Sequence, residues 1–351
     1  MPSPIVIDGS HGEGGGQLLR TAVALAAITG RALEIDHVRA RRAKPGLAPQ
    51  HMAAVRAVAA LCGAQVDGVA LRSQALTFVP GGARGETFDF DVGTAGSVTL
   101  VLQALLPVLI ARGEAAEIAV RGGTDVRMAP PLDYFREVTL QLLARMGVRT
   151  ELVARRRGYY PRGGGEVALR LQHSRLHPTA FACSGLVHRI DGLAHVARID
   201  RNVAVRMRDA CLAELSVRTG VRTEIDIAEL ASEQALGSGG AIVAWTRTDS
   251  TVLGAGRVAE RGVRAETLGA AVAEELGADL AAGVGLDVHA ADQMPVYLAL
   301  AGGGSFSTRW LSSHAQTAIW LIEQFLPVRF DATSEGARVC VRATARAEAL
   351  P

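Results

Sequence analysis

An order of strands and helices that recurs along the chain is the feature that most limits its fold. Residues 4–80 read as strand, helix, strand, helix and two strands, and residues 88–171 repeat that order. In both copies the predicted helices end at a glycine, such as Gly30 and Gly63, which is a common helix stop. A repeat of about 80 residues predicts similar units that pack together around a shared core.

A third copy is present but interrupted. The segments DVHAADQMPVYLALAGG, SFSTRW, SSHAQTAIWLIEQFL, PVRFDA and ARVCVRAT give helix, strand, helix and two strands. Residues 184–283, which precede it, contain strands and helices of their own. We therefore predict an α+β protein with three βαβαββ units in a large domain (residues 1–183 and 284–351) and a smaller inserted α/β domain (residues 184–283).

Several classes of protein are excluded by composition. No pair among Cys62, Cys183, Cys211 and Cys340 has CxxC or zinc-finger spacing, which favours free thiols in a reducing compartment. The first residues, MPSPIVIDGS, lack a signal-peptide pattern, and no apolar stretch is long enough to span a bilayer. We expect a cytoplasmic protein without a membrane partner. Since the net charge is only +2, any contact with nucleic acid must come from a local patch.

Two glycine- or arginine-rich turns are candidate anion sites. HGEGGGQLLR joins the first strand to the first helix, where phosphate groups often bind. It is not a Walker A loop, since the single lysine, Lys44, is followed by proline, so a plain structural turn remains an alternative. In RARRAKPGL, the side chains of Arg39, Arg42 and Lys44 could face one anion, or the loop could simply be solvated.

Histidine is the candidate nucleophile. His314, in SSHAQT, lies near the predicted start of a helix, which disfavours imidazolium and so predicts a neutral ring near pH 7. A polar neighbour of the helix cap is the alternative interpretation. HAADQ, residues 289–293, could hold a base and a ribose or only cap its helix. RGYYPRGGG is predicted to be the tip of a β-hairpin.

Together these segments resemble a known family. Its motifs are matched, in order, by GSHGEGGGQLLR, RARRAKPGLAPQH, VGTAGSVTLVLQ, RGGTDVRMAPP, RGYYPRGGGEV, HAADQMPVYLALAGGGSF and SSHAQTAIWLIEQFLPVRF. The chain resembles the RNA 3′-terminal phosphate cyclases over nearly its whole length. The resemblance implies ATP-dependent conversion of an RNA 3′-phosphate end to a 2′,3′-cyclic phosphate, with release of AMP and pyrophosphate.

The resemblance also implies roles for individual residues. His314 would carry AMP as a phosphoramidate, and Glu13 would contact a divalent metal, Mg²⁺ or Mn²⁺. The implied ATP contacts are Gln17, Arg20, Gln103, Pro130, His289, Ala290, Ala291, Asp292 and Gln293. The implied RNA phosphate contacts are Arg39, Arg42, Gln50 and His51.

The chain departs from the family pattern at two positions. His289 stands where relatives often have tyrosine, and Arg41 stands where they usually have a small residue. Two other functions stay open: a non-catalytic cyclase-like protein that acts in ribosome assembly, and an enolpyruvyl-transferase-like enzyme. Lysine-dependent nucleotidyl transfer is excluded because Lys44 is not in a KxDG motif.

Overall fold

The computed structural model describes residues 3–82 and 85–346, and residues 1–2, 83–84 and 347–351 lie outside this description. The first unit follows the predicted order. Its elements are β1 (Ile5–Asp8), α1 (Gly16–Thr29), β2 (Leu33–Asp36), α2 (Pro49–Cys62), β3 (Gln65–Asp67) and β4 (Leu76–Val79). The glycine stops are confirmed, since Gly30 and Gly63 end α1 and α2 in the left-handed conformation.

The second unit repeats this order with one irregular helix. Its elements are β5 (Thr87–Asp91), α3 (Val98–Arg112), β6 (Ala116–Gly122), α4 (Leu132–Tyr134), the π-helical turn η1 (Phe135–Thr139), α5 (Leu140–Arg145), β7 (Thr150–Arg156) and β8 (Gly165–Leu171). The strands β7 and β8 pair antiparallel, so RGYYPRGGG is the hairpin tip that the sequence predicts.

The third unit is completed by a strand that the sequence pattern does not reveal. Its elements are β9 (Thr179–Phe181), α8 (Val288–Ala291), α9 (Met294–Leu300), β14 (Gly303–Thr308), α10 (Ser313–Phe325), β15 (Val328–Glu335) and β16 (Arg338–Ala345). β9 pairs parallel to β14, so residues before the inserted segment supply the first strand. The strand orders β1-β2-β4-β3, β5-β6-β8-β7 and β9-β14-β16-β15 are then equivalent.

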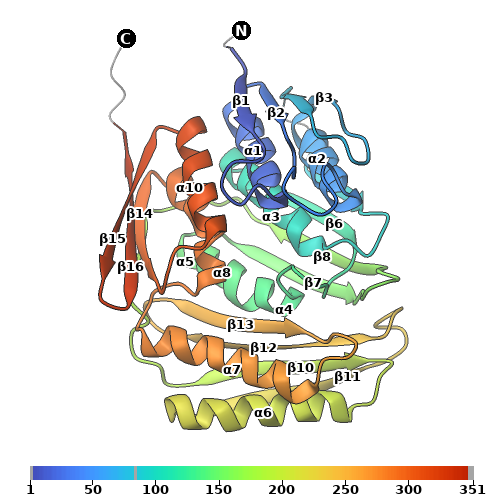
Figure 1. Cartoon of the computed structure of the whole chain (residues 1–351), viewed down its shortest axis with the longest axis vertical. Coiled ribbons are helices and arrows are strands. Elements are labelled where there is room, and N and C mark those ends of the chain that lie inside the picture. The colour runs from blue at the N-terminus through green and yellow to red at the C-terminus, as the bar shows by residue number, and fades with distance from the viewer. Residues whose placement is uncertain (1–2, 83–84, 347–351) are drawn as a thin grey trace.

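The segment between β9 and α8 forms a layer of its own. Its elements are β10 (Ile190–Ala197), α6 (Asn202–Thr219), β11 (Thr223–Leu230), β12 (Gly239–Arg247), β13 (Val252–Val258) and α7 (Ala265–Ala281). The helices α6 and α7 pack on this sheet, and α4 contacts its strands β12 and β13 (Figure 1). The domain boundaries at residues 184 and 283 stay a prediction.

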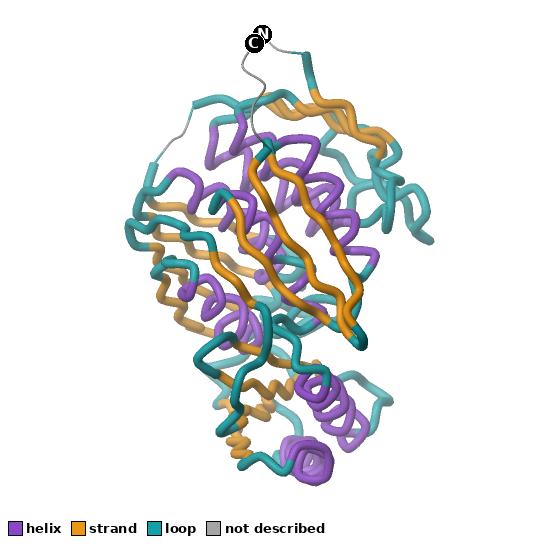
Figure 2. The backbone as a smooth tube through the Cα atoms, turned by 90° about the vertical axis from the view of Figure 1, so that its left-hand side faces the viewer, coloured by secondary structure: helices purple, strands orange, loops and turns teal. Residues whose placement is uncertain are grey.

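The helices of the three units pack together between the sheets, as Figure 2 shows. Helix α1 contacts both α3 and α10, which brings the first and third units into contact. Side chains such as Leu19, Leu25 and Leu102 are almost fully buried in this core. Among the described residues, no helix combines the length and the apolar character needed to cross a membrane.

Candidate active site

The N-terminal ends of α1 and α10 meet. The backbone N–H of Glu13, in the turn before α1, donates to Thr317 Oγ1 of α10 at 3.0 Å. Thr317 Oγ1 in turn donates to the Ser313 carbonyl at 2.7 Å. The side chain of Ser312 caps α10 by accepting a hydrogen bond from the Ala315 N–H at 3.0 Å. The fold thus places residues about three hundred positions apart in one site.

His314 and Glu13 face each other at this junction. His314 Nδ1 lies 3.2 Å from Glu13 Oε1, and Arg42 pairs with the other carboxylate oxygen. The Glu13 side chain is only 4% exposed, whereas that of His314 is 43% exposed. Neither Oε1 nor Nδ1 forms a hydrogen bond within the part of the chain that the structure describes. The accessible imidazole of His314 therefore has a buried carboxylate beside its Nδ1.

This pairing bears on the predicted charge state of His314. Contact with Glu13 raises the pKa of His314, although burial opposes the shift. Burial opposes ionisation of Glu13 too, but His314 and Arg42 together hold the pKa of this carboxyl below its usual value. The helix terminus and the carboxylate 3.2 Å away therefore act on this pKa in opposite directions, and the neutral ring stays a prediction.

A basic group lies beside this pair. Arg20 is 9% exposed, and burial lowers its pKa to about 10, an effect that Glu13 partly offsets. Within residues 3–82 and 85–346, its guanidinium has no hydrogen bond or ion pair. Burial, together with Arg20 and Arg39, lowers the pKa of His51 to about 3, so this ring is neutral and its Nδ1 accepts from the Ala48 N–H. A buried arginine without a partner is suited to an anionic ligand.

The glycines of GEGGGQ make room for these side chains. A Cβ on Gly15 would lie 2.2 Å from the Glu13 carboxylate, and one on Gly16 would lie 2.3 Å from His51 Nε2. Both distances are far below van der Waals contact. Any larger residue would displace the candidate metal ligand or the neutral histidine. In this structure, therefore, the glycines serve the packing of the site itself.

The HAADQ segment joins the same site. Gln17 Nε2 donates to the Asp292 carbonyl at 3.0 Å, and Ser312 Oγ donates to the Asp292 carboxylate. Burial raises the pKa of Asp292. Gln103 lines a small cavity with Asp292 and Gln293. Neither polar atom of the Gln103 side chain has a hydrogen-bond partner among the described residues, which leaves the amide free for a ligand.

His289 lies next to the segment that contains Pro130. Thr99 Oγ1 donates to the Pro130 carbonyl at 2.9 Å, and Tyr134 from the helix that follows meets the His289 ring edge-on at 6.4 Å between centroids. Ala290 and Ala291 are almost fully buried in α8, and the Ala290 N–H donates to the Asp287 carboxylate at 2.9 Å. The nucleotide roles of these four residues stay predictions.

The charge state of His289 follows from its partner. Its Nε2 lies 2.8 Å from Glu275 Oε1, and this contact raises the pKa of His289 to about 9, although the side chain is 51% exposed. Burial opposes ionisation of Glu275, but His289 and Arg257 lower the pKa of this carboxyl to about 2. A group whose pKa is raised on folding stabilises the fold fully below its unfolded pKa. The His289 contribution is therefore lost as the pH rises through about 9.

We expect Glu275→Gln to lower the pKa of His289 from about 9 toward its ordinary value of about 6.5. An NMR titration of the histidine ring resonances measures this shift. Glu274→Gln is the matched control, because Glu274 is the exposed neighbour on the same helix. An unchanged His289 titration in Glu275→Gln would show that this ion pair does not set its charge.

Of the other predicted RNA contacts, Arg39 and Arg42 lie near Glu13, whereas Gln50 lies at the start of α2. Arg42 lies in the site, and Arg39 is within electrostatic range of His51 and Glu13, although its guanidinium donates to the Lys44 and Gly46 carbonyls of its own loop. Gln50, in the first turn of α2, lies against Gly96, where an added Cβ would be 2.9 Å from Gln50 Cβ. The Lys44 side chain forms no hydrogen bond or ion pair among the described residues.

A buried ionic cluster was missed by the sequence reasoning. Arg157 pairs with Asp125 Oδ2 at 3.1 Å and with Asp133 Oδ1 at 2.7 Å. His195 Nε2 lies 3.4 Å from Asp133 Oδ2, and Tyr159 Oη lies 3.0 Å from His195 Nδ1. His195 belongs to β10, so the cluster ties the inserted layer to the second unit. No residue spacing pointed to it, since its members come from four separate segments.

Comparison with known proteins identifies the family of this site. The profile of the family described as "RNA 3′-terminal phosphate cyclase" matches residues 11–332. The chain belongs to the RNA 3′-terminal phosphate cyclase family. The resemblance seen in the sequence is thereby confirmed, and the matched residues include Glu13, Arg20 and His314.

Individual relatives of this family match almost end to end. A protein of Nitrosospira multiformis named RNA 3′-terminal phosphate cyclase is 51% identical, with 96% of each chain covered. A protein of the same name from Hyperthermus butylicus is 45% identical, with 92% of each chain covered. Another, from Korarchaeum cryptofilum, is 43% identical, with 93% of each chain covered. The solved structure of the enolpyruvyl transferase NikO from Streptomyces tendae is 14% identical, and the match covers 97% of this chain and 48% of that chain. Its TM-score is only 0.38.

Proposed function

We propose that this chain is an ATP-dependent RNA 3′-terminal phosphate cyclase. It converts an RNA 3′-phosphate to a 2′,3′-cyclic phosphate and releases AMP and pyrophosphate. The observation that carries the proposal is the accessible His314, whose Nδ1 lies 3.2 Å from the buried Glu13 carboxylate and whose sequence neighbour Ser312 caps the helix. Family membership supports the substrate and the nucleotide.

In the first step His314 acts as the nucleophile. With Nδ1 turned toward Glu13, the lone pair of Nε2 is free to attack the α-phosphorus of ATP. The new P–N bond forms as the bond to pyrophosphate breaks, the ring keeps its Nδ1 proton, and the Glu13 carboxylate 3.2 Å away offsets the ring's positive charge. Arg20, buried and without a protein partner among the described residues, offsets the charge that builds on pyrophosphate.

The residues at this junction also fit a divalent metal. Glu13 Oε1 is a buried carboxylate oxygen with no hydrogen bond among the described residues, and carboxylate plus phosphate oxygens is the ligand set that Mg²⁺ prefers. An Mg²⁺ or Mn²⁺ ion held there by Glu13 would neutralise part of the negative charge of the phosphates. Glu13 would then stabilise the His314 imidazolium less, which favours the nucleophilic, neutral ring.

In the later steps AMP passes to the RNA end. An oxygen of the 3′-phosphate attacks the phosphorus on His314, the P–N bond breaks, and an RNA–adenylate forms. The terminal 2′-hydroxyl then attacks the 3′-phosphorus, loses its proton to water and expels AMP. Because this hydroxyl is already held beside the phosphorus, proximity lowers the barrier without a dedicated base. Arg39, Arg42, Gln50 and His51 are the proposed contacts for the RNA phosphates.

A cyclisation assay tests the proposed function. The protein is incubated with ATP, Mg²⁺ or Mn²⁺ and a short RNA that is labelled internally next to its 3′-phosphate. We expect this 3′-phosphate to become resistant to phosphatase. The same RNA with a 2′-deoxy terminal sugar is the control, because it has no hydroxyl to close the ring. Phosphatase protection that needs no ATP, or no protection at all, would contradict the proposal.

A further inference from the structure

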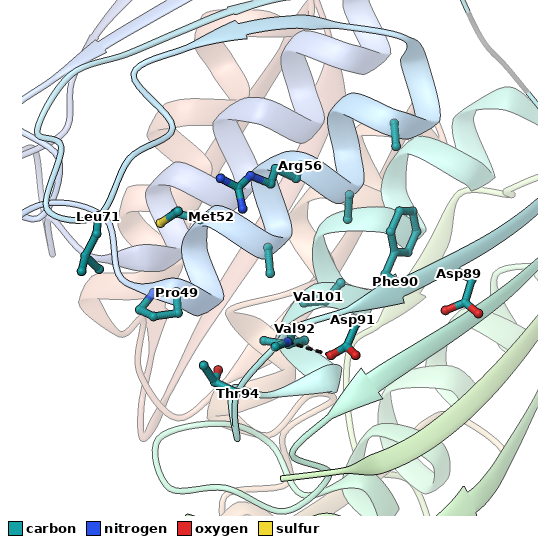
Figure 3. Close-up of a pocket in the computed structure, with 14 residues that line it drawn as sticks. Pro49, Met52, Arg56, Leu71, Asp89, Phe90, Asp91, Val92, Thr94 and Val101 are labelled. Atoms are coloured by element: carbon teal, nitrogen blue, oxygen red, sulfur yellow. Dashed lines mark hydrogen bonds between the residues drawn. The ribbon is translucent and has the colours of Figure 1, made fainter. Parts of the chain in front are cut away.

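A second cavity lies outside the His314 site. It has a volume of about 630 Å³ and sits between α2 and the strand β5, as Figure 3 shows. Pockets of this size are typical of small-ligand sites. The lining residues are Pro49, Met52, Ala53, Arg56, Ala57, Ala60, Leu71, Asp89, Phe90, Asp91, Val92, Gly93, Thr94 and Val101. None of them has a role in the chemistry proposed above.

The walls of this cavity combine apolar surface with a free cation. Met52 and Leu71 lie on one side of it and Phe90 on the other (Figure 3). Arg56 is exposed and forms no ion pair within the described residues; its one hydrogen bond, to the Val69 carbonyl, is 3.4 Å long. The two carboxylates at the rim, Asp89 and Asp91, are both paired with Arg121, at 2.9 Å and 3.5 Å.

The cavity adjoins the proposed RNA site at the start of α2. Pro49 lines the cavity, and the next two residues of the same helical turn are Gln50 and His51. The loop that carries Gly93 and Thr94 returns to this turn, because Gly96 packs directly on Gln50. A chain whose terminal phosphate lies near His51 therefore has the cavity within reach of its next groups.

We propose that this cavity binds one nucleoside near the 3′ end of the RNA. The base packs against Met52 and Phe90, and Arg56 contacts an adjacent phosphate. Single-stranded RNA is bound in this way, by apolar or aromatic contact with unstacked bases and by cations along the backbone. The paired carboxylate of Asp91 can accept hydrogen bonds from an amino group on the base. The inference rests on the proposed function only in placing the RNA end at His51.

A binding experiment without ATP tests this assignment. Fluorescence anisotropy gives the Kd of a 5′-labelled hexanucleotide with a 3′-phosphate, and of the same RNA with an abasic sugar at each of its last four positions. We expect one position at which loss of the base weakens binding about 10-fold. If no abasic position costs more than about twofold, the cavity does not hold a base.

Variants connect that position to the cavity. Ala53→Trp fills the cavity from α2, so its Kd for intact RNA should rise about 10-fold and the abasic penalty should vanish at that position alone. Ala213→Trp, an exposed alanine on α6, is the matched control and should bind like wild type. Met52→Ala removes one wall of the cavity without filling it, so it should reduce the abasic penalty at the same position.

The outcomes separate this inference from the proposed function. An abasic penalty that survives intact in both Ala53→Trp and Met52→Ala would overturn the cavity assignment, whatever the enzyme catalyses. Failure of the cyclisation assay with the position-specific Kd pattern preserved would instead overturn the proposed reaction and leave the nucleoside site standing.

Discussion

Replacement of His314 by alanine is expected to abolish the covalent protein–AMP adduct. Wild type incubated with α-labelled ATP and Mg²⁺ or Mn²⁺ should acquire label that is lost in acid and kept in base, as a phosphoramidate requires. In His314→Ala the yield should fall at least about 1,000-fold, because the variant lacks the ring nitrogen that attacks ATP. Gel electrophoresis of the labelled protein measures the yield.

Two other variants make this result specific. His11→Ala removes a histidine from the turn that carries Glu13, and because His11 stacks on Trp320 at 3.7 Å between ring centroids and has no proposed catalytic role, the adduct should persist. Glu13→Gln keeps the nucleophile but removes the charge beside it, so the adduct should form slowly. An undiminished adduct on His314→Ala, or none on wild type, would contradict the assignment; the second result would favour a cyclase-like binding protein.

Local sequence signals predicted most of the elements. Apolar spacing and glycine stops located the helices α1, α2 and α3, and the repeat predicted the common unit whose strand order three sheets now share. The first strand of the third unit, β9, was missed because the inserted segment separates it from β14 and it is only three residues long. A pairing partner more than a hundred residues away leaves no local pattern.

The site was predicted by family resemblance more than by local pattern. The two residues to which the resemblance assigns the nucleophile and the metal contact, His314 and Glu13, lie 3.2 Å apart, and the effect of Glu13 on the pKa of His314 was not part of the prediction from the helix. The sequence could not show that a turn at the other end of the chain sets this pKa. The same limit explains the missed cluster around Arg157, whose partners become neighbours only when β10 packs on the second unit.

That cluster makes Arg157 a residue whose loss should cost much stability. Its guanidinium lies between Asp125 and Asp133, both of which are almost completely buried. Burial opposes ionisation of the two acids, but Arg157 and His195 hold their pKa values below the usual range. Without Arg157, Asp133 would keep Arg136, which lies 2.9 Å from its Oδ1, whereas among the described residues Asp125 would keep only His195 as a charged partner.

We expect Arg157→Met to lower the free energy of unfolding by about 3–5 kcal/mol, the usual cost of breaking a buried ion pair. Urea denaturation at pH 7.5 measures it. Arg155→Met is the matched control, because Arg155 is 59% exposed and pairs with the partly exposed Glu166, an interaction that contributes at most about 1 kcal/mol. A loss no larger than that of Arg155→Met would show that the cluster does not stabilise the fold.

The pH dependence of that loss identifies its cause. In Arg157→Met the pKa of Asp125 should rise above that of the unfolded chain, because its burial and the repulsion from Asp133 are no longer opposed by the guanidinium. The folded variant then binds more protons than the unfolded chain, so its stability falls as the pH rises through this range. The gap to wild type should therefore narrow between pH 7.5 and pH 4.5. An equal gap at both pH values would assign the loss to packing of the arginine stem instead of the uncompensated charge.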